Sequence, residues 1–208
     1  EKIRGNEAHY DQRDPYDLDD DGNVMEPDGL LDNLFVVHAG LGEEEGGADD
    51  SIWSHRSVIG PEPIAIPGTT LKAYDYIIQP EDGATGVFAH EYGHNLGLPD
   101  EYDTGYTGSG SPVEAWSLMS YGSWTGRIPG TEPTGFSPWD KMFFATRYGG
   151  NWSVPTIVNP SKGKVPQQLI VNEAVANSKY GKIIKVELPN KIVSPPLQPL
   201  GKKSYYST

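Results

Sequence analysis

Two histidines four residues apart carry the clearest chemical signal in this sequence. His90 and His94 belong to the stretch HEYGHNLGLPD, and this spacing puts both side chains on one face of a helix. Glu91 follows the first histidine, and Gly97 allows the chain to turn back in a left-handed conformation toward Asp100. The stretch predicts one zinc ion held by His90, His94 and Asp100. Glu91 would lie close to the metal without binding it.

This ligand set suits catalysis because a catalytic zinc has three protein ligands and one open position for water. The ion lowers the pKa of that water to about 7, and Glu91 could take the proton and pass it to a leaving amine. The predicted reaction is therefore hydrolysis of a peptide bond by a zinc-bound water. H-E-x-x-H alone also occurs by chance, but the added G-x-x-D makes the pattern specific. Glu101 is the rival third ligand, although its spacing from His90 favours Asp100.

A second informative stretch, WSLMSYGSW, covers residues 116–124. Met119 has a soft, unbranched side chain that could form a hydrophobic floor beneath the zinc ligands without competing for the metal. Tyr121 could direct its hydroxyl toward the zinc or toward the developing oxyanion. The alternatives are ordinary core packing for Met119 and an aromatic residue in a surface groove for Tyr121.

The acidic stretch DLDDDGNVMEPD, residues 17–28, has the spacing of a calcium loop. Asp17, Asp19 and Asp21 occupy positions one, three and five, Gly22 takes the turn at six, and Asp28 stands at twelve. Alternate side chains would converge on a hard cation that prefers oxygen ligands. Aspartate at position twelve is shorter than the usual glutamate. A solvated acidic turn is the alternative interpretation.

The elements that must position these residues indicate an α+β fold. On the zinc helix, which should open at residues 81–83, the apolar side chains of Phe88, Tyr92 and Leu96 are predicted to form the core face. The strand at 33–39 is expected to be buried. The predicted elements are strands at 33–39, 51–59 and 73–79, a proline-rich loop at 60–70 and a helix at 136–148. The acid-rich residues 40–50 should form a surface loop, with a second calcium site as the less favoured alternative.

Composition excludes several classes of protein. The net charge of −13 argues against a nucleic-acid partner, and no apolar run is long enough to span a bilayer. There is no cysteine, so neither disulfides nor thiolate metal sites contribute. Residues 151–208 carry eight lysines and two glutamates, which reverses the sign of the charge. This shift predicts a catalytic domain at 1–150, followed by a linker and the beginning of a β-rich domain at 151–208.

The zinc motif followed by SLMSYGSW resembles a metzincin, with a zinc helix, a glycine turn, a third ligand and a Met-turn. Residues 14–148 resemble the immune inhibitor A family of secreted bacterial metalloproteases. The features that carry this resemblance are aspartate as third ligand, the calcium-like loop, and the stretches VVHAG, IWSHRS and LPDEYD. The resemblance implies a zincin catalytic domain with a mixed twisted sheet and an active-site helix. It also implies secretion to the extracellular space, stabilisation by calcium and synthesis with a propeptide. Tyr121 resembles the tyrosine that approaches zinc in related proteases.

The family has further strands and a helix before the calcium loop, and a β-domain after the last residues. The resemblance therefore implies a fragment, or one chain of a nicked molecule whose other chain completes the sheet. In that case residues 33–39 should have one unpaired edge unless a partner covers it. The substrate would be an extended polypeptide that adds to an edge strand, either 51–59 or 73–79. The alternative function is a calcium-stabilised surface or adhesion module with a structural or vestigial zinc site, although a structural site has no use for Glu91.

Overall fold

The computed structural model describes residues 2–105, 107–108, 110–150, 155–158 and 183–186. The chain divides into two compact units, with residues 1–137 in the first and the second beginning at Pro138. The first unit contains all of the sequence motifs described above. It is α+β, as predicted, with a small mixed sheet and few helices.

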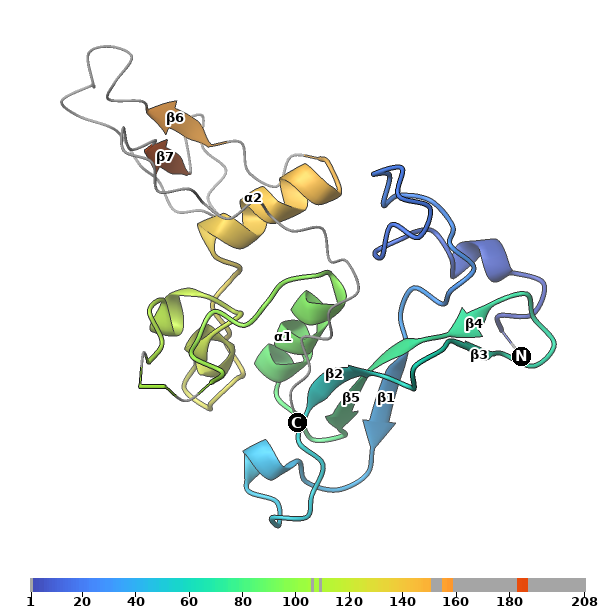
Figure 1. The fold of residues 1–208 in the computed structure, drawn as a ribbon. Helices are drawn as coiled ribbons and strands as arrows, with labels where there is room; N and C mark the ends of the chain where they lie inside the picture. The colour runs from blue at the N-terminus through green and yellow to red at the C-terminus, as the bar shows by residue number, and fades with distance from the viewer. Residues whose placement is uncertain (1, 106, 109, 151–154, 159–182, 187–208) are drawn as a thin grey trace. The chain divides into compact units, whose positions relative to one another are not determined.

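The central element of the first unit is a three-stranded sheet. It consists of β1 (Phe35–His38), β2 (His55–Val58) and β5 (Asp75–Pro80), in the order β1-β5-β2. β1 runs parallel to β5 and β2 runs antiparallel to it (Figure 1). β5 is therefore the middle strand, and the side chain of its residue Ile77 is fully buried. The three strands predicted from the sequence all form, each within or close to its expected range.

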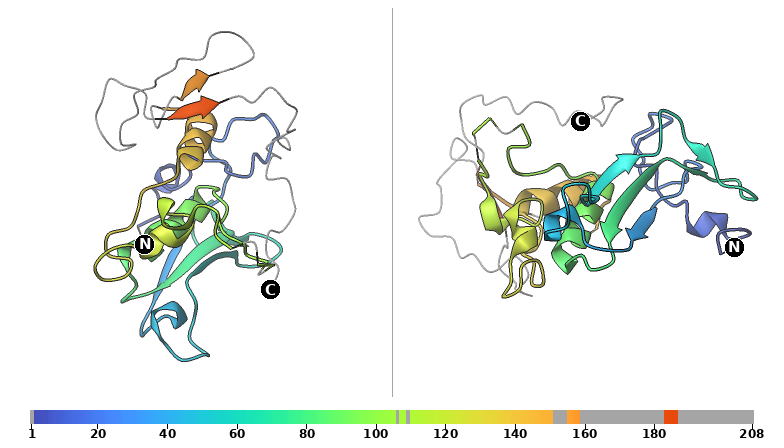
Figure 2. Two further views of the ribbon diagram at one scale, coloured as in Figure 1. Left: turned by 90° about the vertical axis from the view of Figure 1, so that its left-hand side faces the viewer. Right: turned by 90° about the horizontal axis from the view of Figure 1, so that it is seen from below.

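The helix α1 (Thr85–Asn95) follows β5 and packs against the sheet (Figure 2). The amide of the buried Gln79 in β5 donates to the carbonyl oxygen of Val87 in α1 at 3.4 Å. The helix begins later than the sequence predicts. Residues 81–83 precede it because the Gly83 amide donates to the Pro80 carbonyl oxygen at 3.2 Å, which closes a turn, and Ala84 is the N-cap residue.

Shorter elements complete the first unit. The predicted proline-rich loop at 60–70 is partly wrong, since β3 lies within it and pairs antiparallel with β4 in a small ribbon. Their bounds are Ile64–Ala65 for β3 and Lys72–Ala73 for β4. The 3-10 helices are η1 (Glu7–His9), η2 (Glu43–Glu45), η3 (Glu114–Trp116) and η4 (Tyr121–Trp124). Residues 40–50 therefore contain one turn of 3-10 helix within the expected loop.

Burial differs from the predictions at two elements. β1 was expected to be buried, but Phe35, Val36 and Val37 are all exposed. Among the described residues, only β5 pairs with this strand. On α1, the predicted core face is also wrong, since Tyr92 is exposed while the face that carries His90 is buried. The helix thus buries the side that carries His90 and Glu91.

The second unit contains α2 (Pro138–Arg147), β6 (Thr156–Val158) and β7 (Ile184–Val186). α2 matches the predicted helix at 136–148, and its Phe144 is fully buried. β6 and β7 pair in parallel. Within the described parts of the chain, no helix combines the length and apolarity that crossing a membrane requires.

Candidate metal centre

Three ligand atoms from α1 and the loop after it converge on one point. The Nε2 atoms of His90 and His94 lie 3.2 Å apart. The Oδ1 atom of Asp100 lies 3.1 Å from the first and 3.3 Å from the second. Ligands bonded at about 2.0–2.1 Å to a tetrahedral zinc are about 3.3 Å from one another, so these separations fit that ion.

Backbone carbonyl groups fix the tautomer of both imidazole rings. Nδ1 of His90 lies 2.8 Å from the carbonyl oxygen of Leu118, and Nδ1 of His94 lies 2.8 Å from that of Leu98. A carbonyl oxygen can only accept, so each Nδ1 must carry the proton. In the neutral rings each Nε2 then presents a lone pair to the shared point. Such hydrogen bonds orient a metal-binding histidine and make it a better ligand.

The electrostatics of this cluster require a positive charge at its centre. Oδ1 of Asp100 is buried and has no hydrogen-bond donor among the described residues. Burial raises the pKa of Asp100, but protons on the facing Nε2 atoms of His90 and His94 hold this pKa well below its ordinary range, and a bound metal cation would take the place of those protons. A carboxylate facing two imidazole nitrogens is the donor set of a zinc site with an open position. The residues therefore fit the metal predicted from the sequence.

The glycine turn brings Asp100 to the histidines in the predicted way. Gly97 has φ of 95°, in the left-handed region that favours glycine, and its amide donates to the carbonyl oxygen of His94 at 2.9 Å. Glu101, the rival ligand, accepts a hydrogen bond from the Ser137 hydroxyl at 3.1 Å. Its backbone amide also donates to the Met119 carbonyl oxygen at 2.8 Å. The structure thus brings Asp100, rather than Glu101, to the two imidazoles.

Glu91 lies beside the ligands and is itself buried. One of its carboxylate oxygens lies within 4.8 Å of ligand nitrogens of both His90 and His94, and its side chain faces the same site. Burial raises the pKa of Glu91, against the opposing effect of the two histidines. A buried carboxylate whose pKa is raised is better able to hold a proton near neutral pH, which is what proton transfer in catalysis needs.

Met119 lies directly beneath the ligand-bearing turn of the helix. Its side chain is fully buried, and a Cβ placed on Gly93 would lie only 2.4 Å from the Met119 sulfur. A second close approach occurs at Gly86, whose amide donates to the Gly130 carbonyl oxygen at 2.8 Å and whose added Cβ would meet the Ser123 carbonyl oxygen. Glycine destabilises a helix relative to alanine, and these close contacts explain why α1 nevertheless contains glycine at both positions.

Tyr121 comes two residues after Met119 and is the first residue of η4. Its side chain is 58% exposed, and its ring stacks on Tyr102 with a centroid distance of 6.5 Å and an interplanar angle of 17°. Tyr102 itself comes two residues after Asp100. The structure therefore places Tyr121 beside the segment that carries Asp100, with much of its side chain in solvent.

The acidic loop brings together three of its four predicted calcium ligands. Asp17, Asp19 and Asp21 each offer a carboxylate oxygen within 4.8 Å of the others. The Gly22 amide donates to Oδ1 of Asp17 at 2.9 Å, which closes the turn at the expected position. Asp28 is not part of this group. Its Oδ1 accepts from the Leu30 amide at 2.7 Å, and burial raises its pKa to about 6.

Sequence reasoning missed several groups that shape these sites. The carbonyl oxygens of Leu98 and Leu118 orient the histidines, and no sequence pattern marks a backbone acceptor. Asp14 and Glu26 form a second, overlapping acidic group with Asp19. The acidic composition of this stretch was visible in the sequence, but the approach of Asp14 and Glu26 to Asp19 was not.

Comparison with known proteins shows the family of this chain. The model of the catalytic domain of immune inhibitor A, peptidase M6, matches residues 1–153. This chain belongs to the M6 family of immune inhibitor A peptidases. It is 49% identical over 217 residues to immune inhibitor A of Bacillus thuringiensis subsp. alesti, across 97% of this chain and 31% of that protein. It is 45% identical over 216 residues to the pre-pro-metalloprotease PrtV of Vibrio cholerae serotype O1, across 97% of this chain and 23% of that protein.

The M6 chain described here therefore spans less than a third of the length of these two relatives. Residues 1–153, which match the family's catalytic domain, include α1, the glycine turn and Met119. The chain thus carries the catalytic domain of a metalloendopeptidase family, and the resemblance read from the sequence motifs is confirmed.

Proposed function

We propose that the protein is a secreted, zinc-dependent endopeptidase that cleaves extended polypeptides. The observation that carries this proposal is the convergence of His90, His94 and Asp100 with a buried glutamate beside them. The alternative function, an adhesion module with a structural zinc site, is disfavoured because a structural site needs neither an open coordination position nor a base. Membership of the M6 peptidase family favours the enzyme as well.

The chemistry divides between the metal and the protein. A zinc ion bound at this site supplies Lewis acidity toward water and toward the scissile carbonyl group. Glu91 takes the proton of the attacking water on its carboxylate and later delivers it to the amine of the leaving group. His90 and His94 stay oriented because their Nδ1 protons are held by carbonyl oxygens. Met119 supports the turn of α1 from below.

Tyr121 is the second catalytic candidate. Its exposed hydroxyl would donate a hydrogen bond to the oxyanion that develops on the substrate carbonyl. The stack on Tyr102 keeps the ring close to the segment that carries Asp100. A modest movement of an exposed side chain would bring the hydroxyl to a bound substrate.

The sheet order favours β2 as the strand that receives the substrate. The sequence left residues 51–59 and 73–79 as alternatives, but β5 is the middle strand and has neighbours on both sides. β2 pairs with β5 on one side only among the described residues, and α1 contacts it. An extended substrate could therefore add to β2 on the side away from β5 through backbone hydrogen bonds.

We further propose that Asp17, Asp19 and Asp21 bind calcium and that Asp28 contributes at most after a local rearrangement. Three carboxylates whose oxygens lie within 4.8 Å of one another repel each other unless a cation neutralises them. Calcium prefers such oxygen ligands and tolerates irregular geometry. Calcium bound here would stabilise the loop that precedes β1.

The exposed edge of β1 suits a partner strand. Phe35, Val36 and Val37 are apolar and exposed, and an unpaired apolar edge is a template for another strand. We propose that a strand from outside this chain, in the same longer or processed molecule, pairs with β1. Residues 151–208 would form a linker and the beginning of a β-rich domain, although most of them lie outside the described residues. The domain at 1–150 would follow the zincin pattern of metzincin-like proteases.

Hydrolysis of casein tests the proposal, together with the zinc content of the purified protein. Removal of zinc with a chelator should abolish hydrolysis, and zinc should restore it. Glu91→Gln should lower kcat by about 10²–10⁴-fold while zinc remains bound at one ion per chain. Glu62→Gln, at an exposed loop position, is the matched control and should keep full activity. An active Glu91→Gln protein would refute the assigned mechanism.

A further inference from the structure

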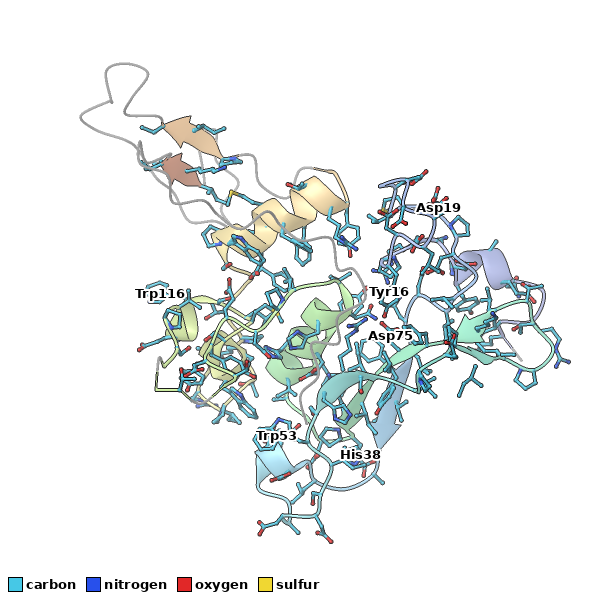
Figure 3. All side chains as sticks on the ribbon, in the orientation of Figure 1. Tyr16, Asp19, His38, Trp53, Asp75 and Trp116 are labelled. Atoms are coloured by element: carbon cyan, nitrogen blue, oxygen red, sulfur yellow. The ribbon has the colours of Figure 1, made fainter. Side chains whose placement is uncertain are left out.

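The side chain of Tyr16 joins the acidic loop to the two strands nearest the proposed substrate site. Its hydroxyl donates to Oδ2 of Asp75, in β5, at 2.8 Å and accepts from Nη2 of Arg56, in β2, at 2.8 Å. Arg56 and Asp75 also form an ion pair with each other. Figure 3 shows Tyr16 and Asp75 meeting between the loop that carries Asp19 and the sheet. One phenol thus contacts a charged group on each strand.

The other end of this connection is the acidic loop itself. Asp14 is buried and its carboxylate accepts from the amides of Tyr16 and Leu18, at 3.2 and 2.6 Å. The amide of Asp17 donates to the Asp14 carbonyl oxygen at 3.2 Å, and the amide of Asp14 donates to that of Val24 at 3.1 Å. Tyr16 is therefore part of a closed loop whose next residue is a proposed calcium ligand. A cation that tightens the loop must also fix the backbone of Tyr16.

The ring of Tyr16 limits the freedom of its hydroxyl. It packs edge-on against the ring of Tyr74, with a centroid distance of 5.5 Å and an interplanar angle of 69°. Tyr74 lies directly before β5. The side chain of Tyr16 is therefore held at its ring by Tyr74 and at its hydroxyl by Arg56 and Asp75. A hydrogen bond to a charged group is stronger than a neutral one, because the full charge adds to the dipole interaction.

We infer that Tyr16 is a positioning residue that transmits cation binding in the acidic loop to β2, the proposed substrate strand. Ordering of the loop fixes Tyr16, Tyr16 fixes the guanidinium group of Arg56, and Arg56 holds β2 against β5. Calcium would then act on substrate binding at a distance, as well as on stability. This inference rests on two elements of the proposed function, the calcium site and the role of β2.

Hydrogen exchange of backbone amides tests the inference without using enzymatic activity. In the wild-type zinc-loaded protein, calcium should slow exchange in the loop at residues 14–24 and slow exchange in β2 by about fivefold. In Tyr16→Phe, calcium should still protect the loop, while the change in β2 should fall below about twofold. Tyr74→Phe keeps the ring contact and the Tyr16 network, so it is the matched control and should behave like the wild type.

Kinetics provide a second readout of the same coupling. At saturating calcium, Tyr16→Phe should raise KM for a peptide substrate about fivefold and change kcat by less than about twofold, because β2 binds the substrate and supplies no catalytic group. Calcium titration should lower KM in the wild type and leave KM of the variant nearly constant.

The outcomes separate this inference from the proposal on which it rests. If calcium protects the loop in both proteins but protects β2 equally in both, transmission through Tyr16 is refuted and the calcium site stands. If calcium leaves the loop amides of the wild-type protein unchanged, the calcium site is refuted, and with it the signal that Tyr16 would carry. Protection of the loop alone in the wild type would also overturn the coupling.

Discussion

The sulfur of Met119 occupies the space in which a side chain on Gly93 would begin. A Cβ on Gly93 would lie 2.4 Å from this sulfur, well inside van der Waals contact. Gly93 lies between His90 and His94 on the buried side of α1. The contact therefore sets how closely α1 approaches the chain at Met119.

Gly93→Ala should destabilise the fold through this contact. Overpacking of a dense core costs about 1–3 kcal/mol, and the better helix propensity of alanine returns at most about 1 kcal/mol. Urea denaturation of the zinc-loaded protein measures the difference. Gly135→Ala is the control, because its Cβ would meet nothing within 4 Å and its stability should be unchanged. In the Gly93→Ala background, Met119→Ala should cost less than it does alone, and equal costs would contradict the contact.

Asp100→Asn should weaken zinc binding, and Glu101→Gln should not. Loss of groups that only orient a ligand already costs about 10–100-fold in metal affinity, so loss of a charged ligand should cost at least as much. Zinc affinity measured by competition with a chromogenic chelator distinguishes the two variants. Glu101 accepts from Ser137 instead of facing the imidazoles, and thus serves as the neighbouring control. The reverse order of affinities would identify Glu101 as the ligand.

Asp28 should make the stability of the calcium-free protein depend on pH. Burial raises its pKa to about 6 in the folded state, above its ordinary value of about 3.9. The stabilising contribution of Asp28 to the free energy of unfolding is therefore fully present below about pH 4. It is lost as pH rises through about 6, where the partly buried carboxyl group must ionise. In a chelator, Asp28→Asn should raise Tm relative to the wild type at about pH 7.5 and change it little at about pH 4. The same difference in Tm at both pH values would show that the carboxyl group does not titrate in this way.

Tyr121→Phe should lower kcat with little change in KM if its hydroxyl stabilises the oxyanion. Removal of one donor to an oxyanion typically costs up to about 10²–10³-fold in kcat, and an exposed, mobile donor should cost about tenfold. Steady-state kinetics on a peptide substrate measures the effect. Tyr102→Phe keeps the stacked ring pair and is the control. An unchanged kcat in Tyr121→Phe would leave this tyrosine as a surface aromatic residue.

The sequence predicted that the side chains of His90, His94 and Asp100 would converge, because the three residues are close together in the chain. His90, His94 and Asp100 lie within eleven consecutive residues, and helix periodicity with one glycine turn determines their geometry. Burial was harder to predict. Val37 belongs to an apolar run that indicates a buried strand, yet its exposure depends on which strands lie beside β1. No local pattern contains that information.

The same reasoning explains the error on α1 and the uncertainty in the calcium loop. Tyr92 was assigned to the core from helical periodicity, but the polar face is the buried one because the Met-turn covers it. Asp28 fits the spacing of a calcium ligand, whereas its carboxylate instead caps the Leu30 amide. Competition between local hydrogen bonds and metal binding is decided by the folded loop, which spacing alone does not specify.

The bond from the Gly86 amide to the Gly130 carbonyl oxygen joins α1 to the stretch beyond the Met-turn, where a side chain on Gly86 would meet the Ser123 backbone. Together with the contact between His90 and the carbonyl group of Leu118, this bond holds the first turn and the middle of α1 against residues 118–130. α1 cannot move away from these residues without separating His90, His94 and Asp100. We therefore expect any motion that admits a polypeptide to occur in the sheet rather than in α1.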